Sequence, residues 1–478
     1  MDRHLIERKT LVVFVGLQLC MVLSSLDGTI VATALPSITR DVGGFSRVTW
    51  VITAYAMAQV VAMPLYGKLG DLYGRKRVLL SAVLLFLLGS TLCGLAQSMD
   101  QLLVARFIQG IGGGGIGTVA MAVTADIIPA RQLGRWMGYQ GMAFAVASVI
   151  GPVVGGLFVD HLSWRWAFLI NLPVGAVGVT IIATQLHVPY RRLQHALDWL
   201  GAGTLMVALA CFIVLTSLGG SELSWTSPTA VALMVAIAVL IVLFIGHERR
   251  APEPVLPLRL FADRVIRTSA AVNFTAGLLL YCGIFFVPIF MQEVHGISPT
   301  SSGLVLTPVM FGAAFGTMIS GRRVERSGHT HVWPIVGGAS SLAGVLLLTR
   351  LTATTPTVLA GLFVLLVGLG AGFAMQPSLL AMQNAAPVED LGTVTSTGLL
   401  FRMLGSTLGV PVFGGILNAG LAGHHRTASR FADALPPVFL AAAPVAAIGI
   451  VFALRTPERA LRGHSLSEPA HVLAEPYA

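Results

Sequence analysis

Charged residues are scarce in this sequence. Asp, Glu, Lys and Arg together make up 11% of the 478 residues, whereas 55% are hydrophobic. A soluble protein carries about 25% charged residues, because its surface faces water. So few charges cannot cover a water-facing exterior of this size. The composition therefore excludes an ordinary soluble fold and indicates that most of the outer surface meets lipid.

Cysteine is rare, and the common catalytic motifs are missing. The four cysteines stand in apolar stretches without CxxC spacing, which argues against a metal site or a disulfide framework. No GxxxxGKS/T, HExxH or GxSxG pattern occurs, so ATP is not the expected energy source. The run Gly110–Gly115 matches the dinucleotide pattern GxGxxG, but it lies inside an apolar segment with no preceding strand. We therefore expect neither an enzyme nor a bound cofactor.

Apolar runs long enough to cross a membrane recur along almost the whole chain. A helix needs about 20 apolar residues to span the hydrocarbon core of a bilayer. The runs between charged, Pro-rich or Gly-rich breaks predict fourteen such helices and no separate soluble domain. The predicted spans are 10–36, 46–66, 77–97, 101–128, 136–160, 164–186, 197–218, 228–246, 266–292, 299–320, 332–350, 356–384, 392–419 and 435–455. The sequence thus predicts an all-α integral membrane protein.

Lys and Arg are distributed unevenly around these spans. If the N-terminus is cytoplasmic, 22 of the 30 basic residues fall in cytoplasmic segments and 6 in external loops. Cytoplasmic loops of membrane proteins carry an excess of Lys and Arg, so this orientation is favoured. It predicts a multi-pass protein of the inner (plasma) membrane with both termini in the cytoplasm. The same bias accounts for the net charge of +9, so we expect no nucleic-acid partner.

Two short patterns recur at nearly the same distance along the chain. The sequence from Gly67 to Arg75 has a counterpart at 321–329, with a carboxylate and a second Gly at the same spacing. The run Gly151–Gly156 is echoed at 409–415. Offsets of 254 and 258–259 residues predict a duplicated six-helix unit, and many secondary transporters are built from such repeats. The predicted divisions are two six-helix bundles (1–187 and 263–456), a two-helix insertion with a cytoplasmic linker (188–262) and a cytoplasmic tail (457–478).

Four stretches together resemble a known family. They are Leu26–Pro36 in the first span, Gly67–Arg77 between spans two and three, Leu103–Gly110 in the fourth span and Ala147–Gly156 in the fifth. In this combination the chain resembles the major facilitator superfamily, specifically its fourteen-span drug:proton antiporter branch, over nearly its whole length. It departs from the pattern at Ala32-Thr33, where relatives commonly have Asn-Val, and at Glu325, which replaces Asp in the repeated loop.

The resemblance implies a fold and a function. The fold would be the major facilitator fold with two inserted helices. The function would be multidrug efflux by antiport, in which the proton motive force exports amphipathic small molecules, chiefly lipophilic cations. Expected partners are that small molecule, membrane lipid and the coupling proton, and the expected state is a monomer.

Three alternatives to this function stay open. They are an exporter dedicated to one metabolite such as an antibiotic, lipid or siderophore, a proton symporter for uptake, and a membrane receptor or scaffold. The Gly-Pro pattern of the fifth span argues against uptake. The lack of a sizeable soluble output domain argues against a receptor.

Asp27 is the one carboxylate of the sequence that lies deep inside a predicted span. An ionised Asp in the membrane interior costs at least a few kcal/mol, so we expect it to face a wet cavity, hold a proton or pair with a cation. Burial favours the protonated carboxyl and a bound cation favours the ionised one, so a proton and a cationic cargo would compete for this group. A permanently paired structural acid is the alternative.

Arg106 is the expected partner of Asp27. Its depth in the membrane differs by about three residues, which is about 5 Å at 1.5 Å per residue. The resemblance assigns Arg106 to proton coupling; outward snorkelling or capping of backbone carbonyls is the alternative. Arg402 lies deeper in its span without an obvious acidic partner, and contact with an anionic group and hydrogen bonds to helix carbonyls are equally open for it.

Asp71 lies in a predicted cytoplasmic loop, where the positive-inside rule does not explain an acid. The resemblance places it near the start of the span that begins around Gly392, whose N–H groups carry partial positive charge. Such a contact would latch the outward-facing state. The expected latch and its charge network comprise Gly67, Asp71, Gly74, Arg75, Lys76, Arg77 and Asp126. The alternative for the basic residues is that they only reflect the positive-inside rule.

Small and polar residues in other spans complete the candidate sites. Gly151, Pro152, Gly155 and Gly156 let the fifth helix pack closely and bend. The resemblance assigns them to a seal against uncoupled leak, and ordinary packing is the alternative. The candidate substrate cavity comprises Asp27, Tyr55, Gln59, Gln140, Asn273, Tyr281, Gln376 and Arg402, with Phe144, Phe285 and Phe286 as stacking surface. Each of these side chains is more often packed than ligand-binding.

Overall fold

A computed structural model describes residues 3–43, 47–128, 130–187, 198–218, 223–252, 254–297, 306–421, 428–459 and 461. Nearly all of these residues are helical. This agrees with the composition, because a backbone surrounded by lipid must satisfy its own hydrogen bonds, and a helix does so within one segment. The predicted all-α fold is confirmed.

The first group of helices extends to Gln185. Its members are α1 (Arg3–Val42), α2 (Val48–Tyr73), α3 (Arg75–Leu95), α4 (Met99–Ile127), α5 (Ala130–His161), α6 (Trp166–Leu169) and α7 (Asn171–Gln185). Helix α1 extends beyond its predicted span at both ends. The predicted sixth span comprises the short α6 and the longer α7.

An inserted pair and a second group of helices follow. The pair is α8 (Trp199–Leu218) and α9 (Pro228–Glu248). The second group comprises α10 (Arg264–Glu293), α12 (Leu306–Ser327), α13 (Val332–Leu348), α14 (Thr357–Ala385), α15 (Leu391–Leu421) and α16 (Ala428–Leu454). Single 3-10 turns at Leu258–Ala262 and Val388–Asp390 precede α10 and α15.

Local sequence sets several of the helix starts. Ser98, Ser227 and Asp263 cap α4, α9 and α10, each accepting a hydrogen bond from a backbone N–H of the first turn. Such caps satisfy N–H groups that have no partner inside the helix. Gly74 separates α2 from α3 with a φ of 90°, a left-handed conformation that glycine adopts without steric cost.

Eleven helices in the described part of the chain are long and apolar enough to cross a membrane. Helix α13 is apolar but has only 17 residues, and α5 and α12 are not among the eleven. The protein is therefore a multi-pass membrane protein. The predicted total of fourteen spans stays a prediction.

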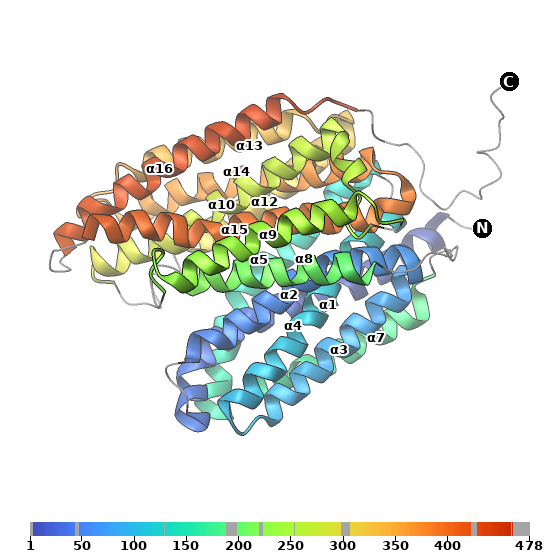
Figure 1. The fold of residues 1–478 in the computed structure, drawn as a ribbon, viewed down its shortest axis with the longest axis horizontal. Coiled ribbons are helices and arrows are strands. Elements are labelled where there is room, and N and C mark those ends of the chain that lie inside the picture. Colours follow the sequence, from blue (N-terminus) through green and yellow to red (C-terminus); the bar gives the residue numbers. More distant parts are fainter. Residues whose placement is uncertain are drawn as a thin grey trace.

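The two groups of helices have the same pattern of neighbours (Figure 1). In the first group α2 and α3 pack on α4, while α1 packs on α5 and α7. In the second group α12 and α13 pack on α14, while α10 packs on α15 and α16. This is the arrangement expected of a duplicated six-helix unit.

Glycines at the closest helix crossings repeat in the same way. A Cβ on Gly110 or Gly114 of α4 would overlap backbone carbonyl oxygens of α2. A Cβ on Gly368 or Gly372 of α14, each 258 positions later, would overlap carbonyl oxygens of α12. The spacing equals the larger of the two offsets seen in the sequence patterns, that of the run at Gly151–Gly156. The glycines let helices approach closely where lipid gives no hydrophobic drive.

The two bundles approach each other at one end and diverge at the other (Figure 1). The approaching end carries the start of α1, the α2–α3 turn and the end of α16, and we call it the basic end because Arg75, Lys76 and Arg77 lie there. Helix α2 packs on α15 and α5 packs on α12, and these are the main helix pairs that join the bundles.

The inserted pair lies beside one of these junctions. Leu209 and Ile213 of α8 pack with Val60 and Val61 of α2 and with Leu400 of α15. Helix α9 packs mainly on α8 and leaves most of its apolar surface exposed. The insertion therefore covers the α2–α15 junction, whereas α9 presents its outer face to lipid.

Gly112 of α4 tests the packing within the first bundle. A Cβ at this position would overlap the backbone nitrogen of Phe86 on α3. We expect Gly112→Ala to lower the free energy of unfolding by about 1–3 kcal/mol, as overpacking of a close-packed interior does. The melting temperature of the purified protein measures this effect.

Gly117 on the same helix supplies the matched control. A Cβ there would meet no atom within 4 Å beyond its own stretch of helix. Gly117→Ala should keep or slightly raise the melting temperature, because alanine favours helix. Equal losses in the two variants would contradict this packing.

Candidate functional site

Asp27 on α1 is fully buried among polar side chains of other helices. Arg106 Nη1 of α4 donates to Asp27 Oδ2 at 2.5 Å. Gln109 Nε2 donates to Oδ1 at 2.7 Å, and Asn171 Nδ2 of α7 donates to the same oxygen at 3.1 Å. Both carboxylate oxygens therefore have donors, and one donor is a cation.

Arg106 is equally buried and is held by groups of α2 and α4. Its Nε donates to the carbonyl oxygen of Val51 at 3.0 Å, and its Nη1 also donates to Gln109 Oε1 at 2.8 Å. The guanidinium carbon lies 4.3 Å from the ring centroid of Tyr55, a cation–π contact. The structure thus brings together Asp27 and Arg106, as their depths predict, and joins α1, α2, α4 and α7 around them.

Three members of this cluster were not predicted from the sequence. Ser90 of α3 accepts hydrogen bonds from Gln109 Nε2 at 3.2 Å and from Asn171 Nδ2 at 2.8 Å, and it donates to the carbonyl oxygen of Phe168 at 2.9 Å. Gln109 lies three positions after Arg106, on the same helix face, and this spacing could have identified it. No comparable signal marks Ser90 or Asn171.

The ion pair forms a nearly neutral unit inside the first bundle. Removing one partner of such a pair costs about 3–5 kcal/mol, because the other charge stays buried without compensation. Of the three environments expected for Asp27, the structure shows the one in which it pairs with a cation. It does not expose the carboxylate between the bundles.

Asp71, near the end of α2, contacts the first turn of α15. The backbone N–H of Gly392 donates to Oδ1 at 3.1 Å. The backbone N–H and the hydroxyl of Thr393 donate to Oδ2 at 2.9 and 3.1 Å. A carboxylate at a helix N-terminus meets unpaired N–H groups and the positive end of the helix dipole. This contact joins the bundles at the basic end.

Arg75 extends the contact to α4. Its Nη2 donates to Asp71 Oδ1 at 3.0 Å, and its Nη1 forms an ion pair with Asp126. Lys76 donates to the carbonyl oxygen of Ala183 at 2.7 Å. Arg77 is exposed and lies outside this network.

Gly67 allows the close approach of α2 and α15. A Cβ on Gly67 would overlap the Ser396 hydroxyl and lie 2.9 Å from the carbonyl oxygen of Gly392. Of the seven residues expected in the latch, Gly67, Asp71, Arg75 and Asp126 therefore meet at or beside this junction. Gly74 forms the turn that follows it.

The repeated loop makes a weaker contact at the other junction. Glu325 of α12 lies 3.4 Å from Arg135 Nη1 of α5, and both side chains are partly exposed. Gly328 has a φ of 74°, like Gly74 in the first loop. In the described part of the chain, the contact at this junction that corresponds to the Asp71 contact is thus a pair of side chains.

The glycines of the α5 motif differ in their surroundings. A Cβ on Gly151 would overlap the hydroxyl of Thr29 on α1, whereas a Cβ on Gly156 would meet no atom within 4 Å. Gly155 is buried. The side chains of Pro152 and Phe144 lie outside the described residues. Close packing of α5 on α1 thus depends on Gly151.

The expected cavity residues do not gather in one place. The Tyr55 hydroxyl lies 2.8 Å from Ser24 Oγ beside Arg106, inside the first bundle. Asn273 Nδ2 donates to the carbonyl oxygen of Ser269 in its own helix. Gln59 is half-buried on α2, and Phe286 is buried in the core of the second bundle. These positions favour packing roles in the state described.

The other cavity candidates lie on α5, α10 and α15. Gln140 Nε2 donates to the sulfur of Met21 at 3.0 Å. Tyr281 is half-buried and stacks on Phe285, with ring centroids 5.9 Å apart. Arg402 is half-buried on α15.

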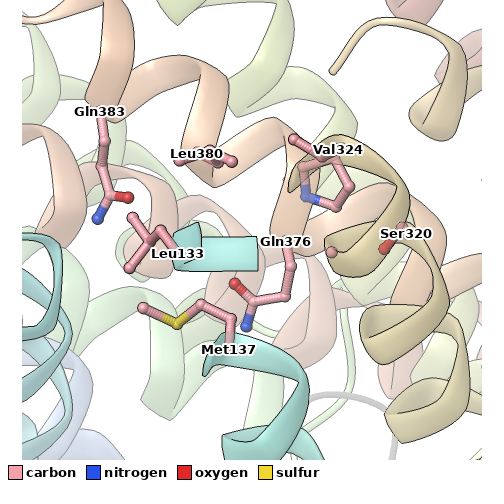
Figure 2. Close-up of a pocket in the computed structure, with 9 residues that line it drawn as sticks. Leu133, Met137, Ser320, Val324, Gln376, Leu380 and Gln383 are labelled. Carbon is pink, nitrogen blue, oxygen red and sulfur yellow. The ribbon is translucent and has the colours of Figure 1, made fainter. Parts of the chain in front are cut away.

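A small pocket lies between α5, α12 and α14 (Figure 2). It is lined by Leu133, Met137, Ser320, Gly321, Val324, Gln376, Pro377, Leu380 and Gln383. Gln376 lies beside Met137 in this pocket, and Gln383 Nε2 donates to Thr395 Oγ1 at 3.0 Å. Both bundles form its walls, so it belongs to the junction rather than to either bundle alone.

A comparison with known families assigns the chain. The model of the Major Facilitator Superfamily matches residues 17–198, 182–410 and 270–476. The chain belongs to the major facilitator superfamily. It is therefore a membrane transporter and not an enzyme.

Curated relatives within the superfamily include efflux proteins. Multidrug resistance protein 3 of Bacillus subtilis is 37% identical over 408 residues, covering 85% of this chain and 80% of the relative. Multidrug transporter protein MdtP of the same species is 37% identical over 433 residues, covering 90% and 78%. The efflux pump FUS6 of Gibberella fujikuroi is 33% identical over 416 residues, covering 85% and 75%. These relatives support efflux as the direction of transport.

Solved structures share the fold at low sequence identity. The human organic anion transporter MFSD10 has a TM-score of 0.64 at 17% identity and covers 96% of this chain and 100% of its own. The proton:xylose symporter XylE has a TM-score of 0.63 at 14% identity, covering 95% and 97%. At these identities the likeness establishes the fold alone.

Asp71 provides a test of the junction at the basic end. We expect Asp71→Asn to weaken it by at least about 1 kcal/mol, because hydrogen bonds to a charged acceptor are lost. Ser396 is buried under Gly67, so a cysteine placed there reports opening. With the native cysteines replaced, Ser396→Cys should react at least about fivefold faster with an impermeant maleimide when Asp71→Asn is present.

A cysteine at Ser327 is the control, because this residue is exposed at the end of α12 in the parent. Its labelling should be equal in both backgrounds. Unchanged labelling at position 396 would show that Asp71 does not hold the junction closed.

Proposed function

We propose that this protein is a proton-coupled antiporter that exports amphipathic small molecules across the plasma membrane, with Asp27 as the proton-binding group. The Asp27–Arg106 pair carries the proposal. It is a membrane-buried carboxylate whose two oxygens accept hydrogen bonds from Arg106, Gln109 and Asn171, so proton binding must disturb these contacts. The proton is the coupling ion, no other cofactor is required, and the chain acts as a monomer.

Protonation of Asp27 would have a structural consequence. It removes the negative charge that compensates Arg106, and an uncompensated buried guanidinium is costly. Arg106 must then find other acceptors, and it is bonded to Val51 on α2. Helix α2 also carries Asp71, so one helix connects the proton site with the junction at the basic end.

The distribution of basic residues supports a cytoplasmic location for the basic end. The state described would then be closed toward the cytoplasm and open outward. In the proposed cycle Asp27 loses its proton toward the cytoplasm and cargo binds between the bundles. The bundles then rock, and an external proton promotes release of the cargo. Asp71 would hold the outward-facing state, so Asp71→Asn slows turnover in this scheme.

We propose that cargo binding and proton binding influence each other through the structure of the first bundle. Direct competition for one carboxylate would require cargo to reach Asp27, which is enclosed by Arg106, Gln109 and Asn171. Cationic cargo was expected because it would compete with the proton for Asp27. Because Asp27 is enclosed, this reason no longer applies.

Export of a single metabolite is the second candidate function. One relative, 30% identical over 414 residues, is named as the transporter of the acurin A biosynthesis cluster of Aspergillus aculeatus. Transport of chemically unrelated compounds by one preparation would favour multidrug export. Transport of one chemical class alone would favour the dedicated exporter.

Asp27→Asn tests the proposed proton site. Asparagine keeps the size of the side chain but cannot ionise, so we expect pH-gradient-driven transport in proteoliposomes to fall at least about 100-fold, the range typical of losing a proton-transfer group. Exchange of labelled for unlabelled cargo without a gradient should continue. Full gradient-driven transport by the variant would reject Asp27 as the coupling group.

Asp41→Asn is the matched control. Asp41 lies beyond the membrane-spanning part of α1 and pairs with Arg165 at 2.6 Å. The hydrogen bonds from Trp164 and Arg165 lower the pKa of this carboxyl, so it stays ionised throughout the usual assay range. This variant should keep gradient-driven transport close to that of the parent.

A further inference from the structure

Arg402 is a cation near mid-membrane without a counter-ion in the described part of the chain. It lies nine residues beyond Thr393 on α15, about 14 Å along the helix from the Asp71 contact, whereas the bilayer core is about 30 Å thick. No described residue forms an ion pair or a hydrogen bond with its guanidinium. A charged side chain at this depth is costly and is usually matched by a partner.

The face of α15 that carries Arg402 is turned toward the first bundle. Leu399, one turn before it, packs in a cluster with Met63 of α2 and Met137 of α5. Met403 packs against the same cluster. Arg402 therefore lies between Leu399 and Met403, within the stretch of α15 that packs against the first bundle.

Close packing with α10 fixes the backbone at this position. A Cβ on Gly277 would overlap the carbonyl oxygen of Arg402, and the Ser406 hydroxyl donates to that oxygen at 2.9 Å. Tyr281 lies one turn after Gly277 on α10, on the same face of that helix as the contact with Arg402. Phe285 stacks on Tyr281 and is 42% exposed. A cation thus lies beside an accessible aromatic surface.

The first bundle contains neutral side chains without hydrogen-bond partners near the cluster that contains Leu399. Phe14 of α1 and Trp136 of α5 stack edge to face, 4.7 Å apart, in the cluster that contains Leu399. One turn beyond them are Gln18 and Gln140. The Gln18 amide and the buried Oε1 of Gln140 have no partner among the described residues. Gln140 is only 9% exposed, so its free oxygen is costly unless a ligand or solvent satisfies it.

We propose that Arg402 binds the anionic group of an amphipathic export substrate, such as a carboxylate or sulfonate. Asp27, the acid expected to attract cations, is already paired with Arg106, whereas the positive charge of Arg402 has no counter-ion among the described residues. Guanidinium groups bind carboxylates and related anions with charge-assisted hydrogen bonds. The inference rests on the proposed export function and replaces lipophilic cations with amphipathic anions as the substrate class.

Counterflow in proteoliposomes tests this specificity without proton coupling. Vesicles loaded with an unlabelled probe take up the same labelled probe if the protein exchanges it. The anionic probe is 8-anilinonaphthalene-1-sulfonate, and the cationic probe of similar size is ethidium. The variants are Arg402→Gln, Arg402→Lys and, as a control, Arg430→Gln, which changes an exposed arginine at the start of α16.

We expect the parent and Arg430→Gln to exchange the sulfonate in preference to ethidium. Arg402→Gln should reduce sulfonate exchange at least tenfold and raise the ratio of ethidium to sulfonate exchange, and Arg402→Lys should keep part of the sulfonate activity. A misfolded variant would lose both probes, so the ratio separates specificity from folding. The assignment would be overturned if the parent does not exchange the sulfonate, whether or not it exchanges ethidium. It would also be overturned if Arg402→Gln exchanges the sulfonate as fast as the parent.

The outcome is distinguishable from failure of the proposed function. If sulfonate exchange depends on Arg402 but a pH gradient drives no accumulation, the anion site stands and proton coupling fails. If a gradient drives ethidium in an Asp27-dependent manner and sulfonate is not exchanged, proton coupling stands and the anion site fails.

Discussion

The buried ion pair between Asp27 and Arg106 constrains the whole first bundle. Groups on α1, α2, α4 and α7 make its hydrogen bonds, so none of these helices can shift far without exposing a charge to an apolar interior. Ser90 of α3 bonds two of those groups, Gln109 and Asn171. Such a cost favours motion of the bundle as one body. Movement is then concentrated where α2 meets α15 and α5 meets α12. The same bonds that enclose the proton site thus make the bundle a rigid unit of transport.

The two junctions between the bundles are built from equivalent helices but are held by different chemistry. Asp71 receives two backbone N–H groups and a hydroxyl at the start of α15, whereas Glu325 meets one partly exposed arginine. Backbone donors at a helix end are fixed in place, while an exposed ion pair is worth less than about 1 kcal/mol. The two junctions thus share a similar helix arrangement, whereas the residues at each one make them unequal.

Sequence reasoning recovered the features that depend on depth and spacing. Apolar runs predicted the helical membrane fold, and the depths of Asp27 and Arg106 predicted their meeting. The family resemblance, rather than depth or spacing, predicted that Asp71 lies near the start of the span at Gly392. Sequence reasoning did not predict that Ser90 and Asn171 belong to the Asp27 cluster, and it assigned Tyr55 to the substrate cavity. The contacts of these residues depend on how each helix is rotated about its axis. Helices that are apolar on all sides give no hydrophobic signal for that rotation. The domain limits and the roles of the site residues stay predictions.

The position of α8 has a consequence for how molecules dissolved in the bilayer could reach the protein. It lies across the α2–α15 junction, and no described helix outside the bundles lies across the α5–α12 junction in the same way. The two flanks that an acyl chain or a lipophilic molecule meets are therefore different. Any sideways approach from the surrounding leaflet meets α8 at the α2–α15 junction, whereas at the α5–α12 junction it meets the bundle helices themselves.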